Sequence, residues 1–231
     1  MTFLTDSIEL ISGFINLGGP VVAILMLLSV VSLAVIVMKL WEFSRLHVGR
    51  RNRAENAVRL WIENRPTEAL ALARAGRSPA AQGVARAIAL ISGGQRDKAD
   101  IEERLSRSAV GQLHALQSGF RLLDAVAQIA PLLGLFGTVL GMIDAFRKLQ
   151  TAGSVVDPTI LAGGIWVALL TTAAGLAVAM PVSLVLTWLE SRVENERVAI
   201  ETLTSDILAP AGIIAEAESV SSVPEGLSLA S

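Results

Sequence analysis

The chain has 231 residues, of which 52% are hydrophobic and 17% charged, and its formal net charge at pH 7 is −2. Soluble domains carry about 25% charged residues, so this composition disfavours a purely soluble protein. The sequence has no cysteine, which excludes disulfides, thiolate metal sites and cysteine nucleophiles, and it has no basic run with interleaved aromatics that would indicate nucleic-acid binding.

The first expected element is a short helix over residues 1–17. Apolar residues recur in it near helical spacing, as they do in amphipathic helices that lie on a membrane surface: Phe3, Leu4, Ile8, Ile11, Phe14 and Ile15. A cleavable signal peptide would begin with basic residues, whereas this segment carries Asp6 and Glu9. We therefore expect the first apolar span to be an anchor and not a leader. Gly18, Gly19 and Pro20 separate it from the short helix over residues 1–17.

Three uncharged stretches follow, at residues 18–38, 125–143 and 158–189. The first two have roughly the 20 residues that cross a bilayer as a helix, and the third is long enough to extend beyond the bilayer at one end. The predicted fold is therefore an all-α integral membrane protein with three transmembrane helices. With their flanking residues these spans are placed at 18–43, 122–146 and 159–189, with a periplasmic loop at 147–158.

Residues 44–121, between the first two spans, are expected to form a helical region outside the bilayer. Pro66 suits the first turn of a helix, and Gly76 suits its end. Ser78, which precedes a proline, repeats the start signal, and Gly93 ends the second helix.

Asp97 opens a third helix in this region. No strong stop separates it from the second span, so the sequence predicts one long helix that enters the membrane. The third span is likewise expected to continue outside the bilayer as a helix at 190–215. The Ser-rich end at 216–231 is expected to be disordered.

Lys and Arg residues predict the orientation of the spans. None occurs before Lys39, and a cluster follows the first span: Lys39, Arg45, Arg50, Arg51, Arg53 and Arg59. The positive-inside rule then places the N-terminus in the periplasm, and residues 44–121 and the C-terminus in the cytoplasm. Trp41 and Trp188 fall at the predicted cytoplasmic boundaries, where interfacial aromatics gather.

Small residues are dense in the second and third spans, where they allow helices to approach closely in lipid. The candidate packing or pore-lining positions are Gly134, Gly137, Gly141, Gly164, Ala168, Gly175 and Ala179. Packing within one subunit and the lining of a pore both account for these stripes. Pro131 and Pro181 are predicted to kink their helices, which membranes tolerate.

Three hydroxyls accompany these stripes: Thr138 in the second span, and Thr171 and Thr172 in the third. At 1.5 Å per residue, Thr138 and Thr172 could share a level near the middle of the membrane. Each threonine could instead bond only to a carbonyl of the preceding turn. Their similar depth on glycine-rich faces favours the first interpretation, a polar lining.

No Asp, Glu, His, Lys or Arg lies inside the uncharged stretches at 18–38, 125–143 and 158–189, although a proton relay needs a titratable group. A partner would have to supply it, because Asp144 lies at the outer end of its span. His47 and His114 have no second metal ligand at useful spacing, and no nucleophile–base pair or phosphate-binding loop is present. We therefore expect no enzyme activity, no cofactor and no metal site.

Two stretches carry a resemblance to a known family: APLLGLFGTVLGM at residues 130–142 and ALLTTAAGLAVAMP at residues 168–181. They resemble the MotA/TolQ/ExbB family of proton-channel proteins, and most closely its ExbB/TolQ branch. The resemblance implies a homopentamer of long helices in the bacterial inner membrane. This ring would surround two single-span helices of an ExbD- or TolR-like partner.

That partner would carry the membrane Asp that this chain lacks, and a TonB- or TolA-like protein would be a further partner. Proton flow would then drive rotation and transmit work to the periplasm or the outer membrane. By matching positions, Thr138 and Thr172 correspond to family threonines that face the partner Asp, whereas Thr171 stands where many relatives have Ala.

The sequence departs from the resemblance at Val167, where ExbB and TolQ proteins carry a Glu. An acidic group is therefore missing from the expected pore lining, which leaves open whether the energised task is TonB-type uptake, Tol-type maintenance or another process. A membrane scaffold that only positions partner proteins is the alternative to an ion-driven motor.

Overall fold

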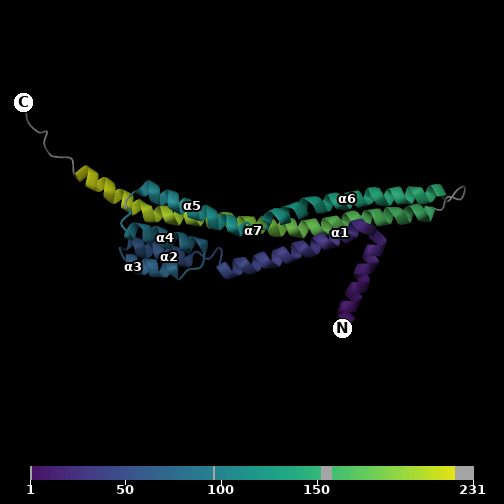
Figure 1. Cartoon of the computed structure of the whole chain (residues 1–231), viewed down its shortest axis with the longest axis horizontal. Helices are drawn as coiled ribbons and strands as arrows, with labels where there is room; N and C mark the ends of the chain where they lie inside the picture. Colours follow the sequence, from purple (N-terminus) through teal and green to yellow (C-terminus); the bar gives the residue numbers. More distant parts are fainter. Residues whose placement is uncertain (1, 96, 152–157, 222–231) are drawn as a thin grey trace, which may run out of the picture. The chain divides into compact units, whose positions relative to one another are not determined.

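The computed structural model describes residues 2–95, 97–151 and 158–221, and over these ranges the chain is helical without any strand. The helices in chain order are α1 (Thr2–Leu46), α2 (Asn52–Ile62), α3 (Pro66–Arg74), α4 (Pro79–Ser92), α5 (Lys98–Leu116), α6 (Phe120–Thr151) and α7 (Pro158–Ser221) (Figure 1). Three segments are long and apolar enough to cross a bilayer: Gly19–Leu46, Phe120–Thr151 and Leu161–Ala209. The predicted all-α architecture with three spans is confirmed.

The chain divides into two compact units. The membrane unit contains residues 1–40 and 119–189, and the polar unit contains residues 41–118 and 190–231. Helices α1 and α7 each contribute residues to both units, and the chain passes between the units a third time at residues 118–119, in the turn between α5 and α6.

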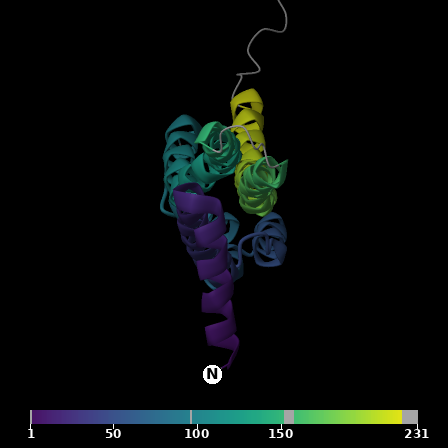
Figure 2. The same cartoon turned by 90° about the vertical axis from the view of Figure 1, so that its right-hand side faces the viewer.

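Helix α1 is broken at Gly19, whose φ of 66° and ψ of −161° are not helical. Glycine tolerates this left-handed conformation because it has no Cβ, and Pro20 follows it. The segment before Gly19 turns away from the rest of α1 (Figures 1 and 2). The predicted break is thus present, while the amphipathic face predicted for residues 1–17 lies outside the described side chains.

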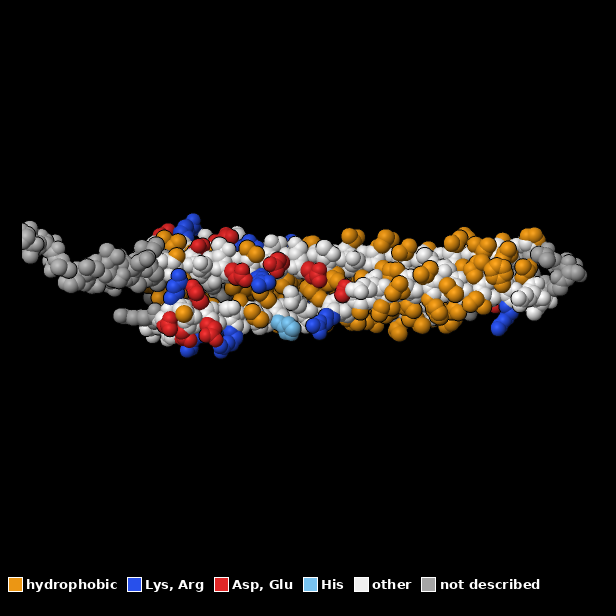
Figure 3. Space-filling model, turned by 90° about the horizontal axis from the view of Figure 1, so that it is seen from above, with side chains coloured by type: hydrophobic (Ala, Val, Ile, Leu, Met, Phe, Trp, Pro, Cys, Tyr) orange, Lys and Arg blue, Asp and Glu red, His pale blue; other side chains and the backbone are white. Residues whose placement is uncertain are grey.

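The membrane unit has a small core and a large apolar surface. Val21 and Leu25 of α1 pack with Ala130 of α6 and Ala179 of α7. Many large apolar side chains remain exposed, among them Leu27, Val30, Leu33, Leu132, Leu135, Trp166, Leu169 and Leu184. Hydrophobic side chains cover the visible face of this unit with few charged groups between them (Figure 3). Such a surface suits lipid or neighbouring spans rather than water.

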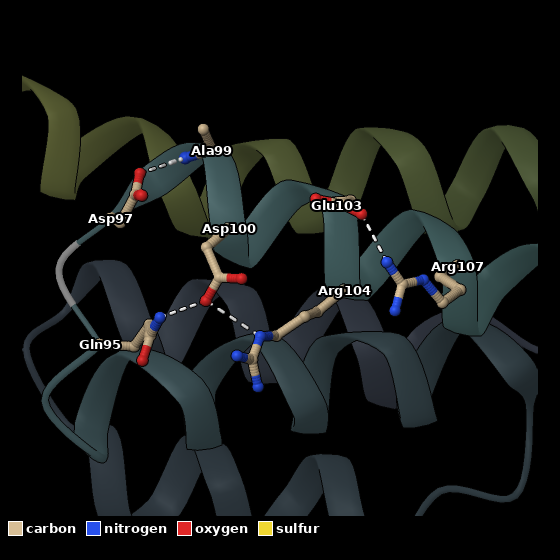
Figure 4. A network of polar contacts seen from close by, with 7 residues as sticks. All are labelled: Gln95, Asp97, Ala99, Asp100, Glu103, Arg104 and Arg107. Atoms are coloured by element: carbon tan, nitrogen blue, oxygen red, sulfur yellow. Dashed lines mark hydrogen bonds and ion pairs between the residues drawn. The ribbon is translucent and has the colours of Figure 1, made fainter.

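Helices α3, α4 and α5 of the polar unit begin where the sequence predicts, whereas α2 has no predicted counterpart. Pro66 opens α3, and the Ser78 side chain accepts a hydrogen bond of 3.2 Å from the Ala81 N–H at the start of α4. The Asp97 carboxylate accepts one of 3.0 Å from the Ala99 N–H at the start of α5 (Figure 4). Each cap satisfies a backbone donor that the first turn of a helix leaves without a partner.

Exposed ion pairs one turn apart follow on α5, where Asp100 contacts Arg104 at 2.9 Å and Glu103 contacts Arg107 at 2.5 Å (Figure 4). Pairs of this kind add a few tenths of a kcal/mol each, about 0.2–0.5 kcal/mol in isolated helices. They support the helix but do not determine how it packs.

The predicted continuous helix from Asp97 into the second span is wrong. Helix α5 ends at Leu116 and α6 begins at Phe120, with Gly119 between them at a φ of 84°. The Gln117 and Ser118 N–H groups bond back to carbonyls of α5, which ends that helix in a turn. A left-handed glycine is a common helix stop, and Gly119 is the sequence signal that could have predicted this one.

Helix α7 extends over 64 residues without interruption, from the third span into the polar unit. It contains Pro181, and α6 contains Pro131, so both prolines lie inside continuous helices. A kink at either proline stays a prediction. The helix reaches Ser221, beyond the predicted end at residue 215, and the rest of the expected disordered tail lies outside the described residues.

Candidate ion-pathway site

The glycines predicted in the two small-residue stripes lie at the contact between α6 and α7. An added Cβ at Gly137 would come within 2.6 Å of the Thr171 hydroxyl oxygen, and one at Gly175 within 2.5 Å of the Ala130 carbonyl oxygen. An added Cβ at Gly134 would lie 2.9 Å from the Thr171 carbonyl oxygen. These positions admit only hydrogen as a side chain, since real Cβ atoms do not approach other atoms so closely.

The same contact accounts for the other small residues of the stripes. A Cβ at Gly141 would meet Ala168, and one at Gly164 would meet Ala145 of α6. Ala168 and Ala179 are buried. The two predicted stripes thus face each other within a single chain, so packing explains their composition whether or not a ring also uses them.

Three hydroxyls gather around one turn of α6. The Thr171 side chain is 1% exposed and donates to the Ala168 carbonyl oxygen at 2.7 Å, while the half-buried Thr172 hydroxyl lies 3.3 Å from the Gly134 carbonyl oxygen. Thr138, also half-buried, donates to the Leu135 carbonyl oxygen at 2.6 Å. Thr138 and Thr172, which the sequence places at a similar depth, bond to the carbonyl oxygens of Leu135 and Gly134, which are adjacent residues of α6.

Two of the three threonines bond within their own helix, and one bonds to the neighbouring helix. Thr138 and Thr171 bond to carbonyls of their own preceding turns, as isolated membrane threonines often do. Thr172 instead bonds across to α6, and Gly134 has no side chain that would block this approach. Thr171 also lies 3.3 Å from the Gly134 carbonyl oxygen, but its single proton is already directed to the shorter bond with Ala168.

A pocket of about 770 Å³ adjoins this contact in the membrane unit. Val167, Thr171 and Asp144 are among its lining residues. Asp144 forms an exposed ion pair of 2.8 Å with Lys148, which also lines the pocket. The two residues are one helical turn apart, so their spacing could have predicted this pair. The resemblance leads us to expect a Glu at position 167, but Val167 presents an apolar side chain to this pocket. Asp144 is the one carboxylate among the described residues that line it.

Two buried charged residues escaped the sequence analysis. Lys39 is 1% exposed in the membrane unit, and Glu196 is 0% exposed in the polar unit. The sequence marks Lys39 only as a flanking positive charge and Glu196 only as one of several acids on a helix. Their burial depends on neighbours that are distant in the chain, so no local pattern predicts it.

Comparison with known proteins points to one family. The family model described as the MotA/TolQ/ExbB proton channel family matches residues 75–202, which is more than half of the chain. The matched range includes the α6–α7 contact and all three threonines.

Individual relatives agree with this match. The chain is 42% identical over 92 residues to the biopolymer transport protein exbB1 of Vibrio cholerae, covering 40% of each chain. It is 34% identical over 110 residues to a biopolymer transport protein ExbB homolog of Methanothermobacter thermautotrophicus, covering 48% of this chain and 38% of the relative. It is 33% identical over 182 residues to the biopolymer transport protein ExbB-like 1 of Synechocystis, covering 77% of this chain and 69% of the relative. The matched segments thus span about two fifths of the first two relatives and about two thirds of the third.

Proposed function

Because the chain belongs to the MotA/TolQ/ExbB proton channel family, we propose that it is a ring-forming subunit of a proton-driven motor in the bacterial inner membrane. The ring surrounds single-span helices of an ExbD- or TolR-like partner, and proton flow between them produces mechanical work for transport or for envelope processes. A TonB- or TolA-like protein receives that work. The relatives named as biopolymer transport proteins support a role of this kind.

The observation that carries the proposal is the hydroxyl cluster at the α6–α7 contact. Thr138 and Thr172 are half-buried and bond to neighbouring carbonyls of α6. Hydroxyl and carbonyl oxygens can pass a proton or solvate a cation, but they do not titrate near neutral pH. A pathway through this chain therefore needs an ionisable group from outside it, which a membrane Asp of the partner supplies.

Within the cluster we assign the ion pathway to Thr138 and Thr172. Thr171 has a packing role, because its side chain is buried in the chain and fills the notch at Gly137. The N-terminus lies in the periplasm, and the polar unit and the C-terminus lie in the cytoplasm, as the positive-inside rule indicates.

The central experiment replaces Thr172 with valine, which has nearly the same shape but no hydroxyl. Loss of one hydrogen bond of about 1–1.5 kcal/mol at the rate-limiting point of the pathway lowers the rate roughly tenfold. Proton flux is measured with a pH-sensitive dye in vesicles that contain the chain and a single-span partner with a membrane Asp. We expect flux to fall while the complex still assembles.

Thr187→Val is the matched control, because Thr187 lies on the same helix, is exposed and bonds only to the Ser183 carbonyl oxygen at 3.0 Å. This variant should keep its flux. Unchanged flux in Thr172→Val would refute the pathway assignment and favour a scaffold that only positions its partners.

A second expected result concerns the assembly. We expect the purified complex, measured by native mass spectrometry, to contain five copies of the 24.3 kDa chain together with its partner helices. The exposed apolar residues of α6 and α7 supply the surface on which neighbouring subunits pack. A monomer or a dimer as the largest stable species would contradict the ring.

A further inference from the structure

The polar unit contains a basic pocket of about 700 Å³. His47, Arg50, Arg53 and Arg77 are among its lining residues, and no Asp or Glu of the described part of the chain lines it. Three arginines and a histidine thus line one concave surface, although the chain as a whole has a net negative charge.

Two turns form the walls of this basic pocket. One follows α1, where His47 and Gly49 both adopt positive φ values of 53° and 87°. The other joins α3 to α4 and includes Gly76, where an added Cβ would collide with Ala81. The Arg53 guanidinium links the two walls by donating to the Ala75 carbonyl oxygen at 2.5 Å.

The first turn is held in place from behind. The Gly49 N–H donates to the Glu196 carboxylate at 2.9 Å, and the Arg50 N–H donates to the His47 carbonyl oxygen at 3.0 Å. His47 therefore occupies a backbone conformation that costs a residue with a side chain some energy, in a turn that the surrounding contacts determine. The pocket is thus built by the fold and does not depend on a ligand to order it.

Two arginines of the pocket have no internal partner. Within the described part of the chain, the side chains of Arg50 and Arg77 form no ion pair or hydrogen bond, and both are exposed. Glu196 is the nearby carboxylate, and its two oxygens already accept the Gly49 and Ala80 N–H groups. The positive charge of the pocket is thus available to an external anion.

The pocket directly follows a membrane span. The candidate membrane span Gly19–Leu46, whose uncharged part ends at Met38, lies directly before His47, and the four residues from His47 to Arg50 extend over at most about 15 Å. Trp41, which is 65% exposed, lies within that segment, and Arg45 stacks over its ring at 5.3 Å. Exposed tryptophans near the end of a span mark the level of the lipid headgroups.

We infer that the basic pocket binds the phosphodiester headgroup of an anionic glycerophospholipid, with Arg50 and Arg77 as the principal phosphate ligands. Guanidinium groups bind phosphate through paired N–H donors, and basic pockets at the end of a span select anionic over zwitterionic headgroups. Among the described residues, no Phe, Trp or Tyr lines the pocket to stack a nucleobase, and no carboxylate lines it to hold a magnesium ion, so a nucleotide fits less well.

The test uses the delipidated full chain in detergent and native mass spectrometry. Phosphatidylglycerol and phosphatidylcholine are titrated separately, and we expect tighter binding of phosphatidylglycerol. The double variant Arg50→Gln/Arg77→Gln should bind phosphatidylglycerol about 30-fold more weakly, because each basic residue near a headgroup contributes about fivefold to the affinity. Arg50→Lys/Arg77→Lys, which keeps both charges, should retain most of the affinity and show that the pocket still folds.

The matched control is Arg104→Gln/Arg107→Gln, which removes the same charge from the exposed face of α5 in the same unit. Its affinity for phosphatidylglycerol should stay within twofold of the unchanged chain. An equal loss in both double variants would overturn the inference, because it would indicate unspecific attraction. Displacement of the lipid by millimolar inorganic phosphate, without a preference for phosphatidylglycerol, would also overturn it and would indicate a soluble phosphate ligand.

Discussion

Gly175→Ala is expected to destabilise the membrane unit by about 2 kcal/mol, the typical cost of forcing a methyl group into a filled site. An added Cβ would lie 2.5 Å from the Ala130 carbonyl oxygen and 3.1 Å from the Gly134 Cα. Both are backbone atoms of α6, so no side chain can rotate away to make room. The two helices would have to separate at the level of the hydroxyl cluster. Thermal unfolding in detergent, followed by size-exclusion chromatography, measures the loss.

Gly163→Ala is the control for this prediction, since it makes the same chemical change on the same helix. No atom lies within 4 Å of the Cβ that it would introduce. Alanine favours a helix over glycine by about 1 kcal/mol, so this variant should be as stable as the unchanged chain or slightly more stable. Equal melting temperatures for the two variants would show that α6 and α7 do not approach each other as closely as described.

The Gly175→Ala variant also tests whether the packing of α6 against α7 affects ion transfer. Gly175→Ala moves α7 away from Gly134, and Thr172 bonds to the Gly134 carbonyl oxygen. It should therefore lower both stability and proton flux, whereas Thr172→Val lowers the flux alone. The comparison shows whether close packing of the two helices is a condition for the position of the hydroxyl.

Glu196→Ala is expected to destabilise the polar unit by about 3 kcal/mol, because it leaves two backbone donors without a partner. The Glu196 side chain is fully buried on α7, and its carboxylate accepts the Gly49 N–H at 2.9 Å and the Ala80 N–H at 3.0 Å. These donors belong to the turn after α1 and to the first turn of α4, which are both far from Glu196 in the sequence. A single side chain thus ties three segments together. Hydrogen–deuterium exchange in peptides covering residues 44–53 and 78–84 should accelerate.

Two variants control for this prediction. Glu194→Ala removes an exposed carboxylate two residues away from Glu196. Its ion pair with Arg197 is long at 4.0 Å, and exposed pairs contribute about 0–1 kcal/mol. Its exchange should not change in either peptide. Glu196→Gln keeps one acceptor oxygen and should show an intermediate effect. If Glu196→Ala leaves both peptides protected, the turn and α4 are held by other contacts.

The Glu196 contact also bears on the basic pocket. The Gly49 N–H that it binds lies in the turn that positions His47 and Arg50. Loss of the carboxylate should therefore weaken binding of the anionic headgroup as well, even though it removes a nearby negative charge. If Glu196 acted only through its charge, its removal would strengthen headgroup binding. The direction of the change in affinity therefore distinguishes a structural contribution of Glu196 from an electrostatic one.

Local patterns in the sequence predict the three spans and most helix ends. A run of about 20 apolar residues can only satisfy its backbone in a bilayer as a helix, which is why the spans need no knowledge of neighbours. Ser78 and Asp97 cap their helices through bonds to residues two or three positions away, so their role is also visible locally. The break at Gly119 is equally local, because a glycine with positive φ ends a helix even where the apolar periodicity continues past it.

Contacts between distant segments decide the rest. The sequence indicates that Thr138, Thr171 and Thr172 share a depth, but only the approach of α7 to α6 buries Thr171 and brings Thr172 to the Gly134 carbonyl oxygen. Adjacent positions on a helix differ by about 100° in direction, so two neighbouring threonines cannot have the same surroundings. The burial of Glu196 and the convergence of arginines on one pocket likewise join residues far apart in the chain, because charge and spacing along a helix do not specify which turn of another segment will lie against it.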